Sequence, residues 1–257
     1  MDLQDFLTIF NDSMVGIFFS ASRIDLVETI LAIETSTPQA SIALWSDGSW
    51  LLKTSFTSDR NHNSMLFEPL AEALECLDER TLSAVIVGTG PGSYSGIRIG
   101  IAAAQGVAIA RGCPVAGLGS LAATPAARSS AGSSQKPAAL AIGDARRGMY
   151  FVAPIMDTGE AMEAELMDAQ AFENHLTDAE GDTLFTLDKP GELALGEDLE
   201  KRVTCSFPEA TLLIDVWLGL TASRQKELCR RPLSPSYLRA PFTSMAKPGH
   251  PLLRKGK

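Results

Sequence analysis

The sequence predicts an α/β protein built as two lobes, and three features of the chain lead to this prediction. The apolar segment 84–87 is followed by a glycine-rich loop and then by an alanine-rich run, which is the order strand, loop, helix. The stretch Leu31–Ser36 is echoed 109 positions later by Leu140–Ala145, and each copy is followed by a turn and a second apolar strand. A breaker-rich segment at 129–137 separates the two copies. A hairpin repeated on either side of such a segment favours a duplicated architecture with mixed sheets.

The first copy holds the elements of one sheet and its helices. The segments 30–33, 40–45 and 49–56 are expected to be strands, and the pair Asp47-Gly48 predicts a tight hairpin turn between the last two. A helix is expected over 64–77, because its leucines recur at helical spacing on one face. After the strand at 84–87, we expect a helix at 95–110, a short strand at 114–118 and a further helix at 120–127.

The loop and helix from Gly88 to Ala110 are the most informative stretch. The glycines at 88, 90 and 92 allow positive φ or a close approach to another surface. Ser93 or Ser95 can cap the first helical turn. Small residues then recur every four positions, at Gly96, Gly100, Ala104 and Ala108. This smooth stripe predicts a helix that packs unusually close to a second helix.

The same loop is a candidate anion site, although it matches no phosphate-binding motif. A Walker loop requires a lysine, and none lies between Lys53 and Lys136. The dinucleotide motif fails because serines stand where its third glycine should be. Tight turning and close packing are therefore the favoured interpretation, while a helix N-terminus can still attract an anion. The candidate contacts for a nucleotide or anion are Thr35, Ser36, Gly90, Gly92 and Ser93.

The composition of the 257 residues is ordinary for a globular protein, with 45% hydrophobic and 21% charged residues. The four cysteines form no Cys-x-x-Cys pair, and the three histidines are far apart, so we expect no metal site and free thiols. No segment reaches the ~18 consecutive apolar residues of a membrane span, and the first residues lack the basic start of a signal peptide. These features predict a cytoplasmic protein that does not contact membranes.

The charge distribution divides the chain unevenly. The net charge is −9, yet 157–200 carries fourteen acids against one lysine, and 222–257 carries nine basic residues against one glutamate. A basic tail can bind nucleic acid or an acidic partner, or it is simply solvated. The acidic stretch argues against an RNA-binding surface on the body of the protein. We expect a flexible extension at 1–28, a first lobe with partner-binding helices at 29–127, a linker at 128–137, a second lobe at 138–231 and a basic tail at 232–257.

Several of these segments together resemble the TsaB (YeaZ-like) family, relatives of the glycoprotease-like M22 proteins. The resemblance is carried by Ile30–Ser36, Gly88–Gly106, Asp144–Tyr150 and Pro235–Arg239, and it extends from about residue 29 to residue 240. The glycine-loop element is specific, whereas the other three would be weak separately.

The resemblance implies an actin/hexokinase-like (ASKHA, ribonuclease H-like) fold. It also implies a role in forming N6-threonylcarbamoyladenosine beside the anticodon of tRNAs that read codons beginning with A. The implied partners are a catalytic paralogue, TsaD, an ATPase, TsaE, and a second copy of the chain; tRNA is reached through the complex, and ATP or ADP is possible only at that level. The family's interface uses the two helices that match 64–77 and 95–110. The implied interface residues are Leu66, Leu70, Leu74, Gly96, Arg98, Gly100 and Ala104.

The departures from the family's catalytic member predict a noncatalytic scaffold subunit. That paralogue carries a His-x-x-x-His metal pair after its glycine-loop helix, and the corresponding stretch 115–122 contains no histidine. Without two imidazoles, no metal is held to polarise the carbamoyl group. His62 is displaced by one position from the family pattern, and we interpret it as an exposed residue at a helix start. Glu34 stands where nucleotide-binding relatives commonly have Asp, which argues against ATP binding by the chain alone.

Other interpretations stay open. The loop serines have no evident His/Asp escort, so a serine hydrolase is unsupported, and neither a metal nor a nucleophile set for a protease is visible. Asp144 and Arg146 are either a ligand-facing pair across the cleft or a turn cap and a surface ion pair. The alternatives to a scaffold are a small-molecule kinase or ATPase of the same fold class, and a tRNA-docking protein that uses the basic residues of 224–257.

Overall fold

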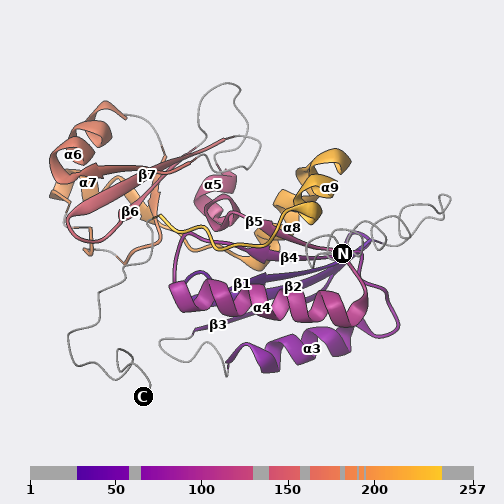
Figure 1. The fold of residues 1–257 in the computed structure, drawn as a ribbon. Coiled ribbons are helices and arrows are strands. Elements are labelled where there is room, and N and C mark those ends of the chain that lie inside the picture. Colours follow the sequence, from indigo (N-terminus) through magenta and orange to yellow (C-terminus); the bar gives the residue numbers. More distant parts are fainter. Residues whose placement is uncertain are drawn as a thin grey trace, which may run out of the picture.

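Two mixed five-stranded sheets, one from each half of the chain, form the framework of the fold (Figure 1). The computed structural model describes residues 28–57, 65–129, 139–156, 163–179, 183–189, 191–193 and 195–238. The predicted two-lobed α/β fold is confirmed.

The first sheet has the strand order β3-β2-β1-β4-β5. Its strands are β1 (Thr29–Glu34), β2 (Gln39–Ser46), β3 (Ser49–Thr57), β4 (Ala84–Gly88) and β5 (Val115–Leu118). β1 pairs with β2 in antiparallel and with β4 in parallel orientation, and every residue of β1 is buried. A central strand covered on both faces needs a continuous apolar sequence, which is why this strand is plain in the sequence.

Helices cover both faces of the first sheet. α3 (Phe67–Leu77) and α4 (Tyr94–Arg111) lie side by side below the sheet in Figure 1, and α8 (Ala210–Gly219) and α9 (Ala222–Arg230) lie above it. On the α3/α4 side the core contains Ile33, Ile42 and Val87. On the other side Trp217 packs in one cluster with Ile30.

The second sheet repeats the topology of the first. Its strands are β6 (Ala139–Asp144), β7 (Met149–Ile155), β8 (Glu165–Asp168), β9 (Leu184–Thr186) and β10 (Val203–Cys205), in the order β10-β9-β6-β7-β8. As in the first sheet, an antiparallel hairpin (β6-β7) is joined to a parallel strand (β9). The helices α6 (Ala169–Asp178) and α7 (Glu197–Glu200) belong to this half. The repeat detected between the two hairpins therefore reflects the same strand order in both lobes.

The predicted boundary of the second lobe needs correction. The helices α8 and α9 lie within the segment 138–231 that was assigned to the second lobe, yet they pack against the first sheet. Leu213, Ile214 and Trp217 of α8 are at most 4% exposed there. Truncating buried side chains of this size typically costs about 2–5 kcal/mol, so α8 is an integral part of the first lobe. Residues 1–27, 130–138 and 239–257, which include most of the predicted extension, linker and basic tail, lie outside the described residues.

The helix predicted at 120–127 is two short elements instead. A 3₁₀ turn, η1 (Ser120–Ala123), is followed by α5 (Pro125–Ser129). Thr124 between them is extended, with ψ 148°. The residue before a proline is disfavoured in the helical region, so Pro125 divides the segment.

All four cysteines are free thiols, as the sequence predicts. Burial raises the pKa of the Cys113 thiol to about 11, and it also raises the pKa of Cys229. Among the described residues, no helix combines the length and the apolar character that a bilayer crossing requires.

Candidate functional site

The glycine loop before α4 is held against the turn between β1 and β2. The backbone N–H of Ser93 donates to the carbonyl oxygen of Ser36 at 2.6 Å, and the hydroxyl of Thr35 donates to the carbonyl oxygen of Gly96 at 2.8 Å. Ser93 caps α4 by accepting the N–H of Gly96, as predicted. A Cβ on Gly92 would lie 2.1 Å from the carbonyl oxygen of Ser36. The glycines therefore serve close packing of the loop against the chain's own turn, which is the interpretation that the sequence favoured.

The same contacts correct the predicted partner face of α4. A Cβ on Gly96 would lie 2.2 Å from the carbonyl oxygen of Thr35, and one on Gly100 would lie 2.3 Å from the Thr35 hydroxyl oxygen. Ala104 is fully buried in the core of the first lobe. The smooth stripe thus packs against β4, β1 and the turn that follows β1, and the assignment of Gly96, Gly100 and Ala104 to a partner interface was wrong.

The leucines of α3 divide in a similar way. Leu66 and Leu70 are buried in the core of the same lobe, so they were also wrongly assigned to an interface. Leu74 is half-buried against that core. Arg98 is exposed, donates to the hydroxyl of Tyr94 and lies over its ring, 4.9 Å from the centroid. Of the seven predicted interface residues, Arg98 and in part Leu74 remain accessible.

The outward face of α4 carries a second stripe that sequence reasoning missed. Ala102, Gly106 and Ala110 are exposed and recur every four residues, and Ile109 between them is 83% exposed. The four most exposed large apolar side chains of the described residues lie on or beside α3 and α4: Ile109, Phe67, Tyr94 and Met65. These side chains lie at the two ends of α4 and at the start of α3, and together with the smooth stripe they are called here the outward face. Exposed apolar side chains of this kind are typical of a surface that another protein covers. The four-residue spacing of Ala102, Gly106 and Ala110 is the sequence pattern that could have revealed this second stripe.

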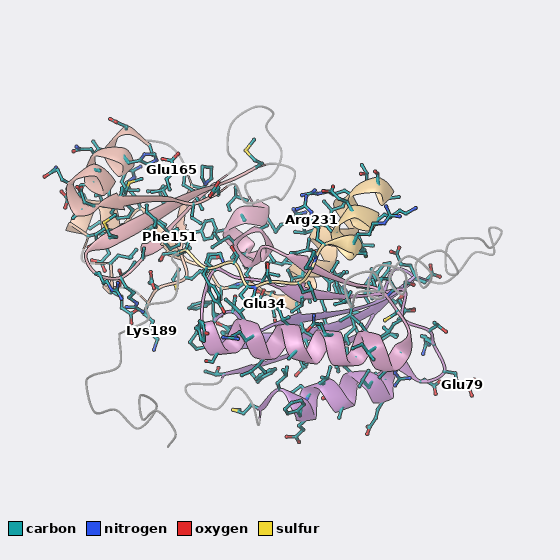
Figure 2. All side chains as sticks on the ribbon, in the orientation of Figure 1. Glu34, Glu79, Phe151, Glu165, Lys189 and Arg231 are labelled. Carbon is teal, nitrogen blue, oxygen red and sulfur yellow. The ribbon has the colours of Figure 1, made fainter. Side chains whose placement is uncertain are left out.

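A cavity of about 760 Å³ lies between the two lobes. Its first-lobe wall comes from the β1–β2 turn and the start of α4, and its second-lobe wall includes Phe151, which is labelled in Figure 2. Three predicted anion contacts line it, namely Ser36, Gly92 and Ser93. Thr35 and Gly90 are buried outside the lining, and the Thr35 hydroxyl is engaged with α4.

The C-terminal segment of the described chain crosses the glycine loop and forms one side of this cavity. The N–H of Ser236 donates to the carbonyl oxygen of Thr89 at 2.8 Å. The ring of Tyr237 stacks on Tyr94, with 5.2 Å between centroids. The beginning of the predicted basic tail is therefore a packed part of the cavity wall. The Ser36 hydroxyl and the Tyr237 hydroxyl are buried here without a hydrogen-bond partner among the described residues.

Charges of both signs line the second-lobe side of the cavity. Asp144 pairs with Arg146 at 3.1 Å and also accepts the Arg146 N–H, so the pair is at once a turn cap, a surface ion pair and a part of the cavity wall. Asp188 accepts the N–H of Asp144, and burial raises the pKa of Asp188. The remaining charged lining residues are Lys189 and Glu192.

Glu34 is buried behind the glycine loop, near the centre of the molecule (Figure 2). One carboxyl oxygen accepts the N–H of Ser36 at 2.7 Å, and the other has no hydrogen-bond partner among the described residues. Burial raises the pKa of this carboxyl group. A Cβ on Gly88, the last residue of β4, would lie 1.8 Å from the unpartnered oxygen of Glu34. The carboxyl group therefore fills the space directly beside the end of β4. An acid in this position does not favour a phosphate group.

Replacing Glu34 with glutamine should flatten the dependence of stability on pH. In the unfolded chain the carboxyl ionises near its ordinary pKa of 4.5, whereas burial in the folded state raises the pKa and holds the proton to higher pH. Stability is therefore lost as pH rises between the two pKa values, by about 1.4 kcal/mol per pH unit. Chemical denaturation of both proteins at pH 4 to 8 measures the difference. Glu34→Gln should become the more stable protein as pH rises, and parallel curves would contradict the assignment.

The described residues contain no group of three or more His, Cys, Asp or Glu side chains that could hold a metal ion. The segment 115–122, where the family resemblance leads us to look for the histidine pair of a catalytic member, contains no histidine. The residues at this position do not fit that metal. His62 lies outside the described residues.

Comparison with known proteins identifies the family. The family model described as "TsaD: tRNA N6-adenosine threonylcarbamoyltransferase" matches residues 56–222. The TsaB protein of Haemophilus influenzae is 28% identical over 86% of this chain and 98% of its own length. The TsaB protein of Escherichia coli is 35% identical over 95 residues, a match that spans 36% of this chain and 40% of the E. coli protein.

Solved structures agree on the fold. A Pseudomonas aeruginosa protein described as similar to the peptidase YeaZ superposes with a TM-score of 0.60 at 24% identity, covering 82% of this chain and 100% of that one. YeaZ from the same organism gives a TM-score of 0.56 at 20% identity, covering 81% and 100%. Because the family model spans well over half of the chain, the protein belongs to the TsaD family, and within it the protein is TsaB/YeaZ-like.

Proposed function

We propose that this chain is a noncatalytic scaffold subunit in the formation of N6-threonylcarbamoyladenosine in tRNA. The observation that carries the proposal is the outward face of α4 and α3. Ile109, which is 83% exposed, lies on α4 with the small exposed residues Ala102 and Gly106, and Phe67, which is 58% exposed, begins the neighbouring helix α3. The similar TsaB proteins of Escherichia coli and Haemophilus influenzae are tRNA threonylcarbamoyladenosine biosynthesis proteins.

The shape of the outward face suits a helix from another subunit. Small residues four apart allow the axes of two helices to approach closely, and larger side chains on either side interlock with the partner. Arg98 at one end supplies a charge that can anchor a partner residue. The partner we propose is the TsaD-like catalytic paralogue, with a second copy of this chain as the alternative occupant. A TsaE-like ATPase, tRNA and any bound ATP or ADP would join at the level of the complex, in the cytoplasm.

The chemistry of the chain supports a role without catalysis. The paralogue's histidine pair is absent from 115–122, and the buried Glu34 lies behind the loop that would hold a phosphate. The glycines of that loop are closely packed against the chain itself: Gly92 against Ser36 of the β1–β2 turn, and Gly90 against Ile97 and Ser236. A transfer reaction therefore lacks its Lewis acid here, and the reaction would take place on the paralogue.

A small-molecule kinase or ATPase is the second candidate, because the cavity between the lobes has a volume of about 760 Å³. Titration calorimetry of the isolated chain with Mg-ATP, followed by an assay of phosphate release, separates the two functions. The scaffold proposal expects neither micromolar binding nor turnover. Both together would overturn it in favour of the enzyme.

The cellular test measures threonylcarbamoyladenosine in bulk tRNA by mass spectrometry. Removal of the gene should eliminate the modified nucleoside, and a plasmid copy of the chain should restore it. A deletion strain with unchanged modification would refute the proposed function.

A further inference from the structure

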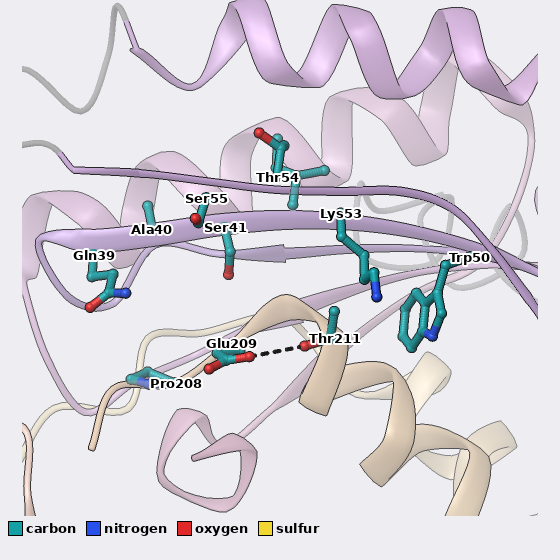
Figure 3. Close-up of a pocket in the computed structure, with 11 residues that line it drawn as sticks. Gln39, Ala40, Ser41, Trp50, Lys53, Thr54, Ser55, Pro208, Glu209 and Thr211 are labelled. Atoms are coloured by element: carbon teal, nitrogen blue, oxygen red, sulfur yellow. Dashed lines mark hydrogen bonds between the residues drawn. The ribbon is translucent and has the colours of Figure 1, made fainter. Parts of the chain in front are cut away.

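A second cavity, of about 360 Å³, lies on the face of the first sheet that is opposite α3 and α4 (Figure 3). Its roof is formed by β2 and β3, and its floor by the start of α8. α8 packs across β1, β2 and β4. β3 is the outermost strand of the sheet. The face of β3 on the α8 side therefore extends beyond the helix and stays open to solvent. The cavity is therefore a consequence of the fold, and it shares the lining residue Gln39 with the cavity between the lobes.

An aromatic side chain and a cation point into this cavity from β3. Trp50 is 36% exposed, and the Lys53 ammonium lies 5.4 Å from the centroid of its ring. Figure 3 shows both side chains extending from the strand towards the helix that carries Thr211. An accessible indole with a neighbouring ammonium combines a stacking surface with a partner for an anion.

The rest of the lining is mixed: Ala40, Ile42 and Pro208 are apolar, whereas Ser41, Glu209 and Thr211 are polar and hydrogen-bonded. The Ser41 hydroxyl accepts the N–H of Ala210 at 2.8 Å, which fixes the first turn of α8 against the sheet. The hydroxyl of Thr211 donates to the carboxylate of Glu209 at 3.2 Å. Gln39 and Ser55 add an amide and a hydroxyl group along the strands. Such groups can form hydrogen bonds with the edge of a heterocyclic base.

We propose that this cavity binds one unpaired nucleotide of an RNA strand. The base stacks on Trp50 and displaces the Lys53 ammonium from the ring, and the ammonium then pairs with the phosphate of the same nucleotide. Stacking on an aromatic side chain beside a basic residue is how proteins commonly hold single-stranded nucleic acid. The choice of RNA rests on the proposed function, which places the chain in a complex that acts on tRNA.

The charge of α9 supports an RNA strand rather than a free nucleotide. α9 and the residue after it carry Arg224, Lys226, Arg230 and Arg231 against Glu227, a local charge of 4 − 1 = +3 in a chain whose net charge is −9. α9 and the cavity lie on the same side of the sheet, at its β5 and β3 ends, about 19 Å apart for four strand spacings. α8 covers the strands between them, so an RNA strand that leaves the cavity would pass over α8 to reach the cations of α9. The outward face of α4 remains free for the protein partner.

The test is a fluorescence titration of the full chain with a ten-nucleotide oligouridylate. Base stacking should quench the emission of Trp50. Trp50→Ala should remove the quenching and weaken binding about tenfold, as the loss of one stacked base does. Lys53→Ala should weaken binding and lower the slope of log K against log salt by about one. Matched controls are Trp45→Phe, which should leave the quenching in place, and Lys201→Ala in the second lobe, which should leave the affinity unchanged.

Two results would overturn the proposal. The first is unchanged affinity of Trp50→Ala for the oligomer, with its thermal stability intact. The second is binding of uridine 5′-monophosphate as tight as that of the oligomer, which would make the cavity a site for free nucleotides. Association with the TsaD-like paralogue, measured on the same variants, keeps this proposal separate from the scaffold function: Trp50→Ala should bind the paralogue normally even if the RNA site is wrong.

Discussion

Gly96→Ala should destabilise the first lobe by ~3 kcal/mol, because the added methyl group would meet a backbone atom. The Cβ would lie 2.2 Å from the carbonyl oxygen of Thr35, a backbone atom of the buried β1–β2 turn that cannot rotate away as a side chain can. The Thr35 hydroxyl also donates to the carbonyl oxygen of Gly96, so separating the two elements would break this hydrogen bond. Overpacking of this kind costs about 1–3 kcal/mol and sometimes more. For a chain of this size that corresponds to a fall in Tm of ~6–12 °C, measured by thermal unfolding.

Gly106→Ala is the matched control, ten residues along the same helix. Nothing lies within 4 Å of a Cβ at Gly106, and the residue is exposed. Alanine favours a helix over glycine by up to ~1 kcal/mol, so this variant should be more stable than the parent. The two substitutions are chemically identical and should act in opposite directions. Equal effects would mean that α4 does not present its 96–100 side to the β1–β2 turn.

The second large effect concerns association rather than folding. Ile109→Arg should weaken binding to the TsaD-like paralogue at least ~30-fold, because truncating a central interface residue costs 2 kcal/mol or more and a buried charge adds to this. The side chain is 83% exposed in the isolated chain, so the free energy of unfolding should hardly change. Titration calorimetry with the purified paralogue measures the affinity.

Leu218→Arg provides the control for this prediction. Leu218 is another exposed apolar residue, at 38% exposure, but it lies on α8 on the opposite face of the sheet. This variant should bind the paralogue like the parent. If both arginine variants lose affinity equally, the effect is one of charge or solubility, and the outward face is not the docking surface.

Local patterns allowed the elements from β1 to β7 to be predicted from the sequence, apart from the division of 120–127, whereas the elements from β8 to α9 were not predicted. The β1–β2 and β2–β3 turns are specified by residues next to them, and the repeat of the first hairpin at β6–β7 predicts the duplication of the sheet. The cap at Ser93 is likewise a contact within four residues. Such features require no knowledge of distant parts of the chain.

The orientation of α4 could not be read from residue size alone. The helix carries two stripes of small residues at four-residue spacing, one through Gly96 and Gly100 and the other through Ala102 and Gly106. The large apolar residues Ile97, Ile101 and Val107 accompany the first stripe, and all are buried. The periodicity of these large apolar residues marks the side of α4 that faces the core. It therefore would have predicted that the stripe through Gly96 and Gly100 is the buried one.

Long-range contacts account for the remaining errors. α8 returns to the first sheet about 180 residues after β1, and Ser236 pairs with Thr89 across the loop. No local pattern encodes either contact. The cavities beside Ser36 and Trp50 follow from these returns, because each has a wall supplied by a distant segment. The sequence therefore could show the candidate side chains without showing the spaces that they line.

The most direct test of the scaffold account is the level of threonylcarbamoyladenosine in bulk tRNA from cells whose own copy of the gene is replaced by Ile109→Arg or by Leu218→Arg. The account predicts that Leu218→Arg supports normal modification, while Ile109→Arg accumulates as a folded protein and fails to support it. Full modification with Ile109→Arg would contradict the claim that this chain works by docking a partner on the outward face of α4.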